Sequence, residues 1–111
     1  MKYTGSMFYS TGLDANGIIR DAVITSKRIS IDWNENGTTG HLVAHSQDGK
    51  TFRGTYGYSS VDALQTLELT LFKAQGEVLL FGTWCDQREE GTWIFRLARL
   101  LGARERQAKK V

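Results

Sequence analysis

The chain consists of eight short segments of alternating apolar and polar residues, separated by turn signals that contain glycine, asparagine or aspartate. The connections are too short for the crossovers that parallel strands need, so successive strands must pair as antiparallel hairpins. The expected strands are Lys2–Ser10, Ile18–Ser26, Arg28–Trp33, Thr39–Ser46, Thr51–Tyr58, Leu64–Lys73, Glu77–Cys85 and Thr92–Ala98. The pattern predicts an all-β, up-and-down meander.

The registers of the last three strands indicate a closed or strongly bent sheet. The turn Gln75-Gly76 registers one hairpin, and pairing Trp84 with Trp93 in the next sets Gly82 against Phe95. An aromatic ring across from a glycine fills the space that the glycine leaves and lets a sheet coil. One face then carries Leu67, Leu69, Leu71, Leu80, Trp84, Trp93, Phe95 and Leu97. We expect this face to line the core of a small barrel or half-barrel, because closure also removes exposed edge strands.

The opposite face of these strands is unusually apolar for a surface in water. It carries Phe72, Leu79, Phe81 and Ile94 beside a few polar residues. Large exposed apolar patches on soluble proteins commonly mark interaction surfaces. We therefore expect a second copy of the chain or the C-terminal segment to cover this face, and a homodimer is the favoured assembly.

The chain has 111 residues, enough for a single domain. We assign that domain to residues 1–98, followed by a basic tail or short helix over residues 99–111. From Arg96 to Val111 there are six basic residues and one acidic residue, whereas residues 1–95 hold eight basic and eleven acidic residues. No aromatic residue is interleaved with the charges of the tail, so we expect a solvated or self-docking segment rather than a nucleic-acid binder.

Composition and residue spacing argue against a disulfide-stabilised protein, a metal-binding protein and a membrane protein. The single thiol, Cys85, can form neither an internal disulfide nor a cysteine-rich zinc site. The carboxylate of Asp86 beside it disfavours a thiolate, so we expect a packing role rather than a nucleophile. His41 and His45 on one strand would lie about 13 Å apart, too far to share a metal ion. No leader-like or membrane-spanning apolar run occurs, and the expected location is the cytoplasm.

Two pairs of residues bear on catalysis. A two-residue turn at Asp48-Gly49 would place His41 opposite Tyr56, as an acid–base pair or a structural hydrogen bond. Glu68 and Arg96 fall on one sheet face, where a structural ion pair is the simpler interpretation. No phosphate-binding loop is present, and we expect no cofactor. We assign no catalytic residue, and a non-enzymatic role is favoured.

Aromatic residues near strand ends give the strongest indication of a ligand site. Aromatic walls with a few polar groups are typical of small-molecule sites. Core packing at the end of a barrel explains the same pattern, and both interpretations stay open. On the first interpretation, the residues around a small, partly apolar ligand are His41, Tyr56, Tyr58, Trp84 and Trp93, with Trp33 nearby.

Three strands share a short motif: Gly54-Thr55-Tyr56, Gly82-Thr83-Trp84 and Gly91-Thr92-Trp93. In this motif, and in the order of strands over residues 2–98, the chain resembles the calycin-type barrels, which include avidins, lipocalins and fatty-acid-binding proteins. The resemblance implies a barrel architecture. It assigns no ligand-binding residue, because Gly5-Ser6-Met7 stands where a lipocalin carries Gly-x-Trp.

The sequence leaves three classes of function open. The favoured class is a non-catalytic barrel that holds a small molecule of unknown identity. The alternative is a homo-oligomeric interaction or assembly module that uses the outer apolar face. The third is a small enzyme with a His/Tyr or Glu/Arg acid–base pair.

Overall fold

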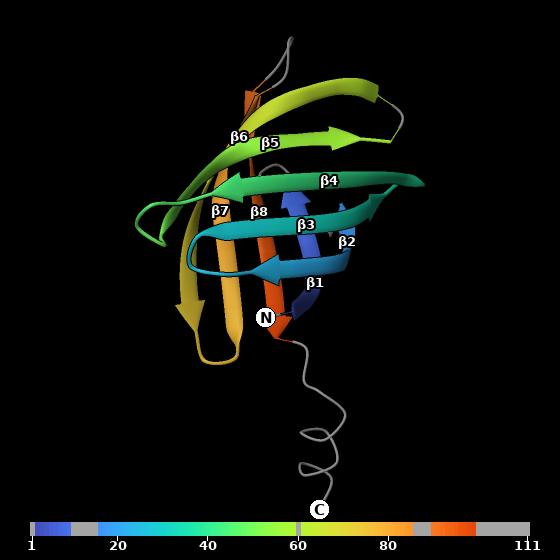
Figure 1. Cartoon of the computed structure of the whole chain (residues 1–111). Coiled ribbons are helices and arrows are strands. Elements are labelled where there is room, and N and C mark those ends of the chain that lie inside the picture. The colour runs from blue at the N-terminus through green and yellow to red at the C-terminus, as the bar shows by residue number, and fades with distance from the viewer. Residues whose placement is uncertain (1, 10–15, 60, 86–89, 100–111) are drawn as a thin grey trace, which may run out of the picture.

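Eight antiparallel strands close into a single barrel (Figure 1). The computed structural model describes residues 2–9, 16–59, 61–85 and 90–99, without the side chains of residues 61–64. The strands are β1 (Lys2–Tyr9), β2 (Gly17–Ile24), β3 (Arg28–Glu35), β4 (Thr38–His45), β5 (Thr51–Tyr58), β6 (Val61–Ala74), β7 (Glu77–Cys85) and β8 (Glu90–Arg99). Each strand pairs with the next, and β1 also pairs with β8, from Tyr3↔Arg99 to Tyr9↔Trp93. The predicted meander is confirmed, and the sheet is closed.

The basic tail or short helix expected over residues 99–111 lies, beyond Arg99, outside the described residues. No helix in the described part of the chain is long and apolar enough to cross a membrane.

The length of β6 allows the sheet to close. At 14 residues it is the longest strand, and Figure 1 shows it bending around the barrel. Its pairs with β5 run from Val61 to Thr70, whereas its pairs with β7 run from Thr66 to Ala74. This offset staggers the neighbours along β6, and closing a sheet into a barrel requires such a stagger.

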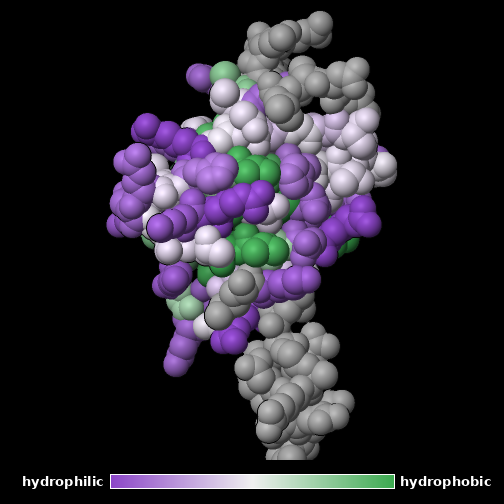
Figure 2. Space-filling model, in the orientation of Figure 1, coloured by the Kyte–Doolittle hydropathy of each residue, from purple (hydrophilic) through white to green (hydrophobic). Residues whose placement is uncertain are grey.

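The interior is filled by side chains from alternate positions of every strand. Every residue predicted for the core face is buried except Trp84, which is half-buried. The remaining core residues are Val78 of β7 and, from the other five strands, Tyr3, Met7, Ile19, Ala22, Ile24, Ile29, Ile31, Trp33, Leu42, Ala44, Phe52 and Tyr56. Outward positions are mainly polar on the side seen in Figure 2, where purple groups cover much of the surface and hydrophobic areas show between them.

Two tryptophan rings, those of Trp33 and Trp84, cover a glycine on the neighbouring strand. Trp33 pairs with Gly40 and Trp84 pairs with Gly91. A Cβ atom at Gly40 would lie 2.2 Å from Cε2 of Trp33, and one at Gly91 would lie 2.6 Å from Cζ2 of Trp84. Only glycine leaves room for the indole ring at these two positions.

This arrangement corrects the register predicted for the last hairpin. Trp93 pairs with Gly82, and Trp84 pairs with Gly91, so the two tryptophans are not opposite each other. Each bulky ring faces a residue without a side chain, which avoids placing two indoles in one space. The shift is two residues, so every side chain stays on its predicted face.

The register predicted for β4 and β5 is wrong by one residue. Tyr56 pairs with Leu42, and His41 pairs with Gly57. Asp48 does not belong to a two-residue turn, because its carboxylate accepts backbone hydrogen bonds from Lys50 and Thr51 and one from the Ser46 hydroxyl, each 2.9 Å long. These bonds build a longer loop and lower the pKa of Asp48 to about 2. A one-residue slip exchanges the two faces, so Tyr56 points inward and His41 outward.

Replacing Gly40 by alanine is expected to lower the free energy of unfolding by about 1–3 kcal/mol, because the new methyl group must displace the Trp33 ring. Denaturant titration measures the loss. The same substitution in a Trp33→Phe background should cost less, since the smaller ring leaves room for the methyl group. Equal losses in the two backgrounds would show that Trp33 is not the cause.

Candidate functional site

Aromatic side chains gather at one end of the barrel, which we call the aromatic end. Strands β1, β3, β5 and β7 end there, and β8 begins there. The inward-facing side chains at this end are Tyr9, Trp33, Glu35, Tyr56, Tyr58, Trp84 and Trp93. The opposite end is mainly aliphatic, with Ile24, Ile29, Leu71 and Val78 among its core residues. The two ends therefore differ in chemistry, and the aromatic end holds a carboxylate, that of Glu35, among its inward-facing side chains.

A half-buried carboxylate, that of Glu35, organises the aromatic end. The Tyr9 hydroxyl lies 2.9 and 2.8 Å from its two oxygens and donates to the carboxylate. The Tyr58 hydroxyl lies 3.0 Å from Oε1 and 3.0 Å from the Tyr9 hydroxyl, and Nε1 of Trp33 donates to Oε1 at 3.2 Å. Three donors from three strands thus converge on one carboxylate, and we call these four residues the Glu35 network.

Both phenols of the Glu35 network are held in their protonated form. Burial raises the pKa of Tyr9 well above its usual value, and the charge of Glu35 and the bond to it add to the increase. Burial is also the main cause that raises the pKa of Tyr58, and its hydrogen bond to Tyr9 raises that pKa further. A phenolate beside a carboxylate in a partly dry site is unfavourable. Tyr9 and Tyr58 therefore remain hydrogen-bond donors well into the alkaline range.

Edge-to-face ring contacts hold the aromatic side chains in place. Such contacts are the preferred geometry for aromatic pairs. The centroids are 5.7 Å apart for Trp33–Tyr58, 5.9 Å for Trp33–Trp93, 5.0 Å for Tyr56–Trp93, 6.2 Å for Tyr56–Tyr58 and 6.1 Å for Tyr9–Trp84. Trp33, Tyr56, Tyr58 and Trp93 form one connected set of rings, and the hydrogen bond between the Tyr9 and Tyr58 hydroxyls joins the Tyr9–Trp84 pair to it.

Two hydrogen-bond donors at the aromatic end stand apart from the Glu35 network. Nε1 of Trp84 and Nε1 of Trp93 are buried and hydrogen-bond to nothing among the described residues. A buried unpaired N–H group costs about 1–3 kcal/mol, and such groups are rare in folded proteins. Trp33 in the same ring set does have a partner, the Glu35 carboxylate. The unpaired indoles are therefore the feature of this end that packing alone leaves unexplained.

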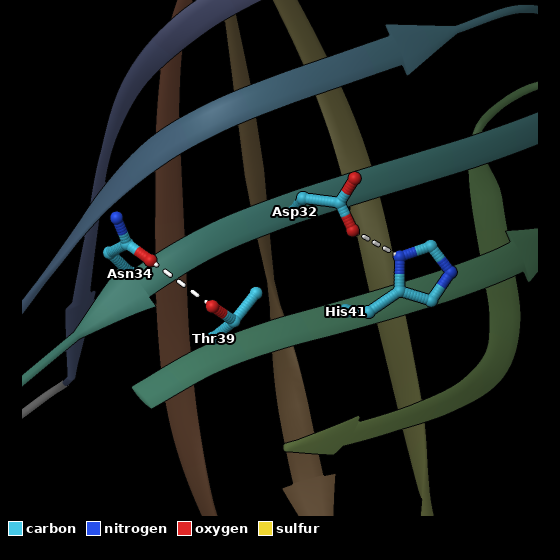
Figure 3. Close-up of polar contacts among 4 residues, drawn as sticks. All are labelled: Asp32, Asn34, Thr39 and His41. Carbon is cyan, nitrogen blue, oxygen red and sulfur yellow. Dashed lines mark hydrogen bonds and ion pairs between the residues drawn. The ribbon is translucent and has the colours of Figure 1, made fainter. Parts of the chain in front are cut away.

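Four of the five predicted ligand residues come together here: Tyr56, Tyr58, Trp84 and Trp93. His41 does not join them. Its side chain is 53% exposed on the outer face of β4, where Nδ1 meets the carboxylate of Asp32 on β3 (Figure 3). A second outer-face contact, between Asn34 and Thr39, links the same two strands at 3.3 Å (Figure 3).

Sequence reasoning missed Glu35 and Tyr9. Glu35 stands in a strong turn signal, Asn34-Glu35-Asn36-Gly37, which hid the fact that β3 continues to it. The alternation of Ile31 and Trp33 on the inner face, extended by one more step, points to Glu35. Tyr9 follows Tyr3 and Met7 in the same way along β1.

The other candidate groups stay apart from the aromatic end. Glu68 pairs with Arg53 at 2.9 Å and Arg96 with Glu77 at 3.3 Å, so the predicted Glu68–Arg96 pair is replaced by two others. Cys85 is exposed at the end of β7. Among the described residues, no group of three or more histidine, cysteine or acidic side chains could hold a metal ion.

The outer apolar face lies over the strands around the β7–β8 hairpin. Phe72 is 49% exposed, Phe81 43% and Leu79 36%, and Ile94 is half-buried. Phe72 pairs with Leu79, and Phe81 pairs with Ile94. Ile94 also pairs with half-buried Phe8 of β1, so the patch crosses four adjacent strands. We call these five residues the outer patch.

No protein-family model matches the chain, and no curated protein matches its sequence significantly. Function must therefore be argued from the chemistry of the aromatic end and of the outer patch.

Stability is expected to fall as the pH rises above about 10, the ordinary pKa of tyrosine. The unfolded chain then releases the protons of Tyr9 and Tyr58, whereas the folded chain keeps them, because both folded-state pKa values are raised. Urea unfolding at a series of pH values above about 10 measures how steeply the free energy of unfolding falls. The double variant Tyr9→Phe/Tyr58→Phe should lose stability less steeply above that pH. An unchanged slope would contradict the burial of the two phenols.

Proposed function

We propose that the protein is a non-catalytic barrel that binds a small molecule at its aromatic end. The residues proposed to contact the ligand are Tyr9, Glu35, Tyr58, Trp84 and Trp93. The observation that carries the proposal is the pair of buried indole N–H groups that find no acceptor in the described part of the chain, beside a carboxylate that is itself satisfied. A ligand atom that accepts a hydrogen bond would remove the cost of leaving them unpaired.

The architecture supports the same proposal. An eight-stranded barrel has an interior that side chains just fill or that holds one small ligand. Here the aliphatic end supplies a packed base, and the aromatic end supplies ring walls with a few convergent polar groups, the usual composition of a small-molecule site. The calycin-like character suggested by the sequence points to this class as well.

An enzyme is less well supported. His41 and Tyr56 lie on opposite faces of the sheet, and Glu68 and Arg96 each have another partner. The two acid–base pairs that the sequence suggested are therefore not assembled. We also propose a reducing compartment, the cytoplasm, as the place of action, because the chain carries a single cysteine, Cys85, and so cannot form an internal disulfide.

Native mass spectrometry of the protein purified from its host should reveal a small adduct that is lost on denaturation. Trp93→Phe keeps an aromatic side chain, smaller than indole, and removes the N–H donor, and it should weaken binding about tenfold, the effect of one lost hydrogen bond. His41→Ala on the outer face is the control and should keep the adduct. Loss of the adduct in the His41 variant but not in the Trp93 variant would contradict the proposed site.

The outer patch supports a second function, self-association into a homodimer. Three of its residues are exposed aromatic or aliphatic side chains on paired strands, and exposed apolar patches commonly mark interfaces. Two ion pairs lie on these strands or beside them: Arg96 of β8 with Glu77 of β7, and Glu68 of β6 with Arg53 of the adjacent strand β5. A surface that carries both signs of charge can match a second copy of itself across a two-fold axis.

Phe81→Asp should abolish concentration-dependent dimerisation, because it places a charge at the centre of the proposed interface. Sedimentation analysis over a dilution series measures the change. Ile18→Asp is the matched control, since Ile18 is 67% exposed on β2 and lies outside the outer patch. Equal effects of the two substitutions, or a wild-type protein that is monomeric throughout, would count against the homodimer.

A further inference from the structure

We infer that the ligand of the aromatic end is an uncharged molecule of the amide type, with a carbonyl oxygen that accepts a hydrogen bond from the indoles of Trp84 and Trp93. This inference rests on the proposed function and specifies the chemistry of the same site.

The need for an acceptor follows from the indoles. An indole N–H is a donor only, so its missing partner must be an acceptor. Nε1 of Trp84 lies against Gly91, and a Cβ atom added to Gly91 would be 2.9 Å from it. Trp93 is the next inward-facing residue on β8 after Gly91, about 7 Å further along the strand. Nε1 of Trp84 thus lies over the first inward position of β8, and Trp93 occupies the second. Both Nε1 atoms are covered by neighbouring atoms, so a ligand reaches them only when the rings around them move.

The charge of Glu35 excludes an anionic ligand. Tyr9, Tyr58 and Trp33 donate to Glu35, and no lysine or arginine among the described residues forms a hydrogen bond or ion pair with the network. A second carboxylate brought into this partly dry site would meet a negative charge with no cation nearby. Charge–charge repulsion is strong where water is excluded.

A purely cationic ligand fits less well than a neutral one. The Glu35 carboxylate already accepts hydrogen bonds from three side chains, so it has less need of a cation. A cation without an acceptor atom would also leave both indoles unpaired. The hydroxyl oxygens of Tyr9 and Tyr58 can each accept a bond as well as donate one. An amide offers both an acceptor for the indoles and a donor for the hydroxyls, since its carbonyl can face the indoles and its N–H group can face the hydroxyls.

Three probes of the same shape separate these possibilities: benzamide, benzoate and benzamidine. They are neutral, anionic and cationic respectively, and benzamidine lacks a carbonyl oxygen. Titration of the ¹⁵N-labelled protein follows the three indole N–H resonances, assigned with Trp→Phe variants. Molecules this small should bind with a Kd on the order of 1 mM. Benzamide should shift the resonances of Trp84 and Trp93. The resonance of Trp33 serves as the reference, because its N–H group is already bonded to Glu35.

Benzoate should bind at least about tenfold more weakly than benzamide to the wild-type protein. Glu35→Gln keeps an acceptor for the hydroxyls but removes the charge, and it should shrink that difference. Benzamidine should leave the Trp84 and Trp93 resonances in place. Benzoate binding as tightly as benzamide, or benzamide binding without moving either resonance, would overturn the inference.

The same data distinguish failure of the inference from failure of the proposed function. If benzoate or benzamidine is the favoured probe, or if native mass spectrometry finds a charged adduct, the site binds ligands but the inferred class is wrong. If no probe shifts any resonance of the aromatic end and the purified protein carries no adduct, the proposed function itself fails.

Discussion

The pairing of β1 with β8 is the constraint on which the rest of the structure depends. Seven antiparallel pairs would make an open sheet with two free edges, and the eighth converts it into a barrel with an inside and an outside. Every second residue of each strand must then fit a space of fixed diameter. The Trp33–Gly40 and Trp84–Gly91 pairs are consequences, because an indole ring fits the wall only where the neighbouring strand has no side chain.

Closure also explains why the polar groups of the interior concentrate at one end. A carboxylate inside a barrel needs donors that approach from several directions, and only a ring of strands supplies them. Glu35 on β3 receives bonds from Tyr9 on β1 and Tyr58 on β5, strands that are distant in sequence and not adjacent to β3 in the sheet. These bonds cross the barrel rather than follow its wall, so they stabilise the closed form as well as the carboxylate.

The alternation of apolar and polar residues predicted most of this fold. The prediction failed where side chains determine the length of a turn. All eight strands and the composition of the core face follow from period-two patterns, and the Gln75-Gly76 turn gave the correct register for β6 and β7. At Asp48 the same reasoning failed, because side-chain bonds to the backbone built a longer loop. That one-residue error assigned His41 to the interior. The Glu35 network was missed because its bonds join strands that no local pattern connects.

The β7–β8 hairpin links the two proposed surfaces. Its inner face carries Trp84 and Trp93 with their unpaired donors, and its outer face carries Leu79, Phe81 and Ile94. Strands that are apolar on both faces are usually covered on both. A ligand at the aromatic end and a second copy on the outer patch would therefore occupy opposite sides of one wall and would not compete. Each would instead restrict the motion of the same two strands, which is a physical route by which binding on one side can favour binding on the other.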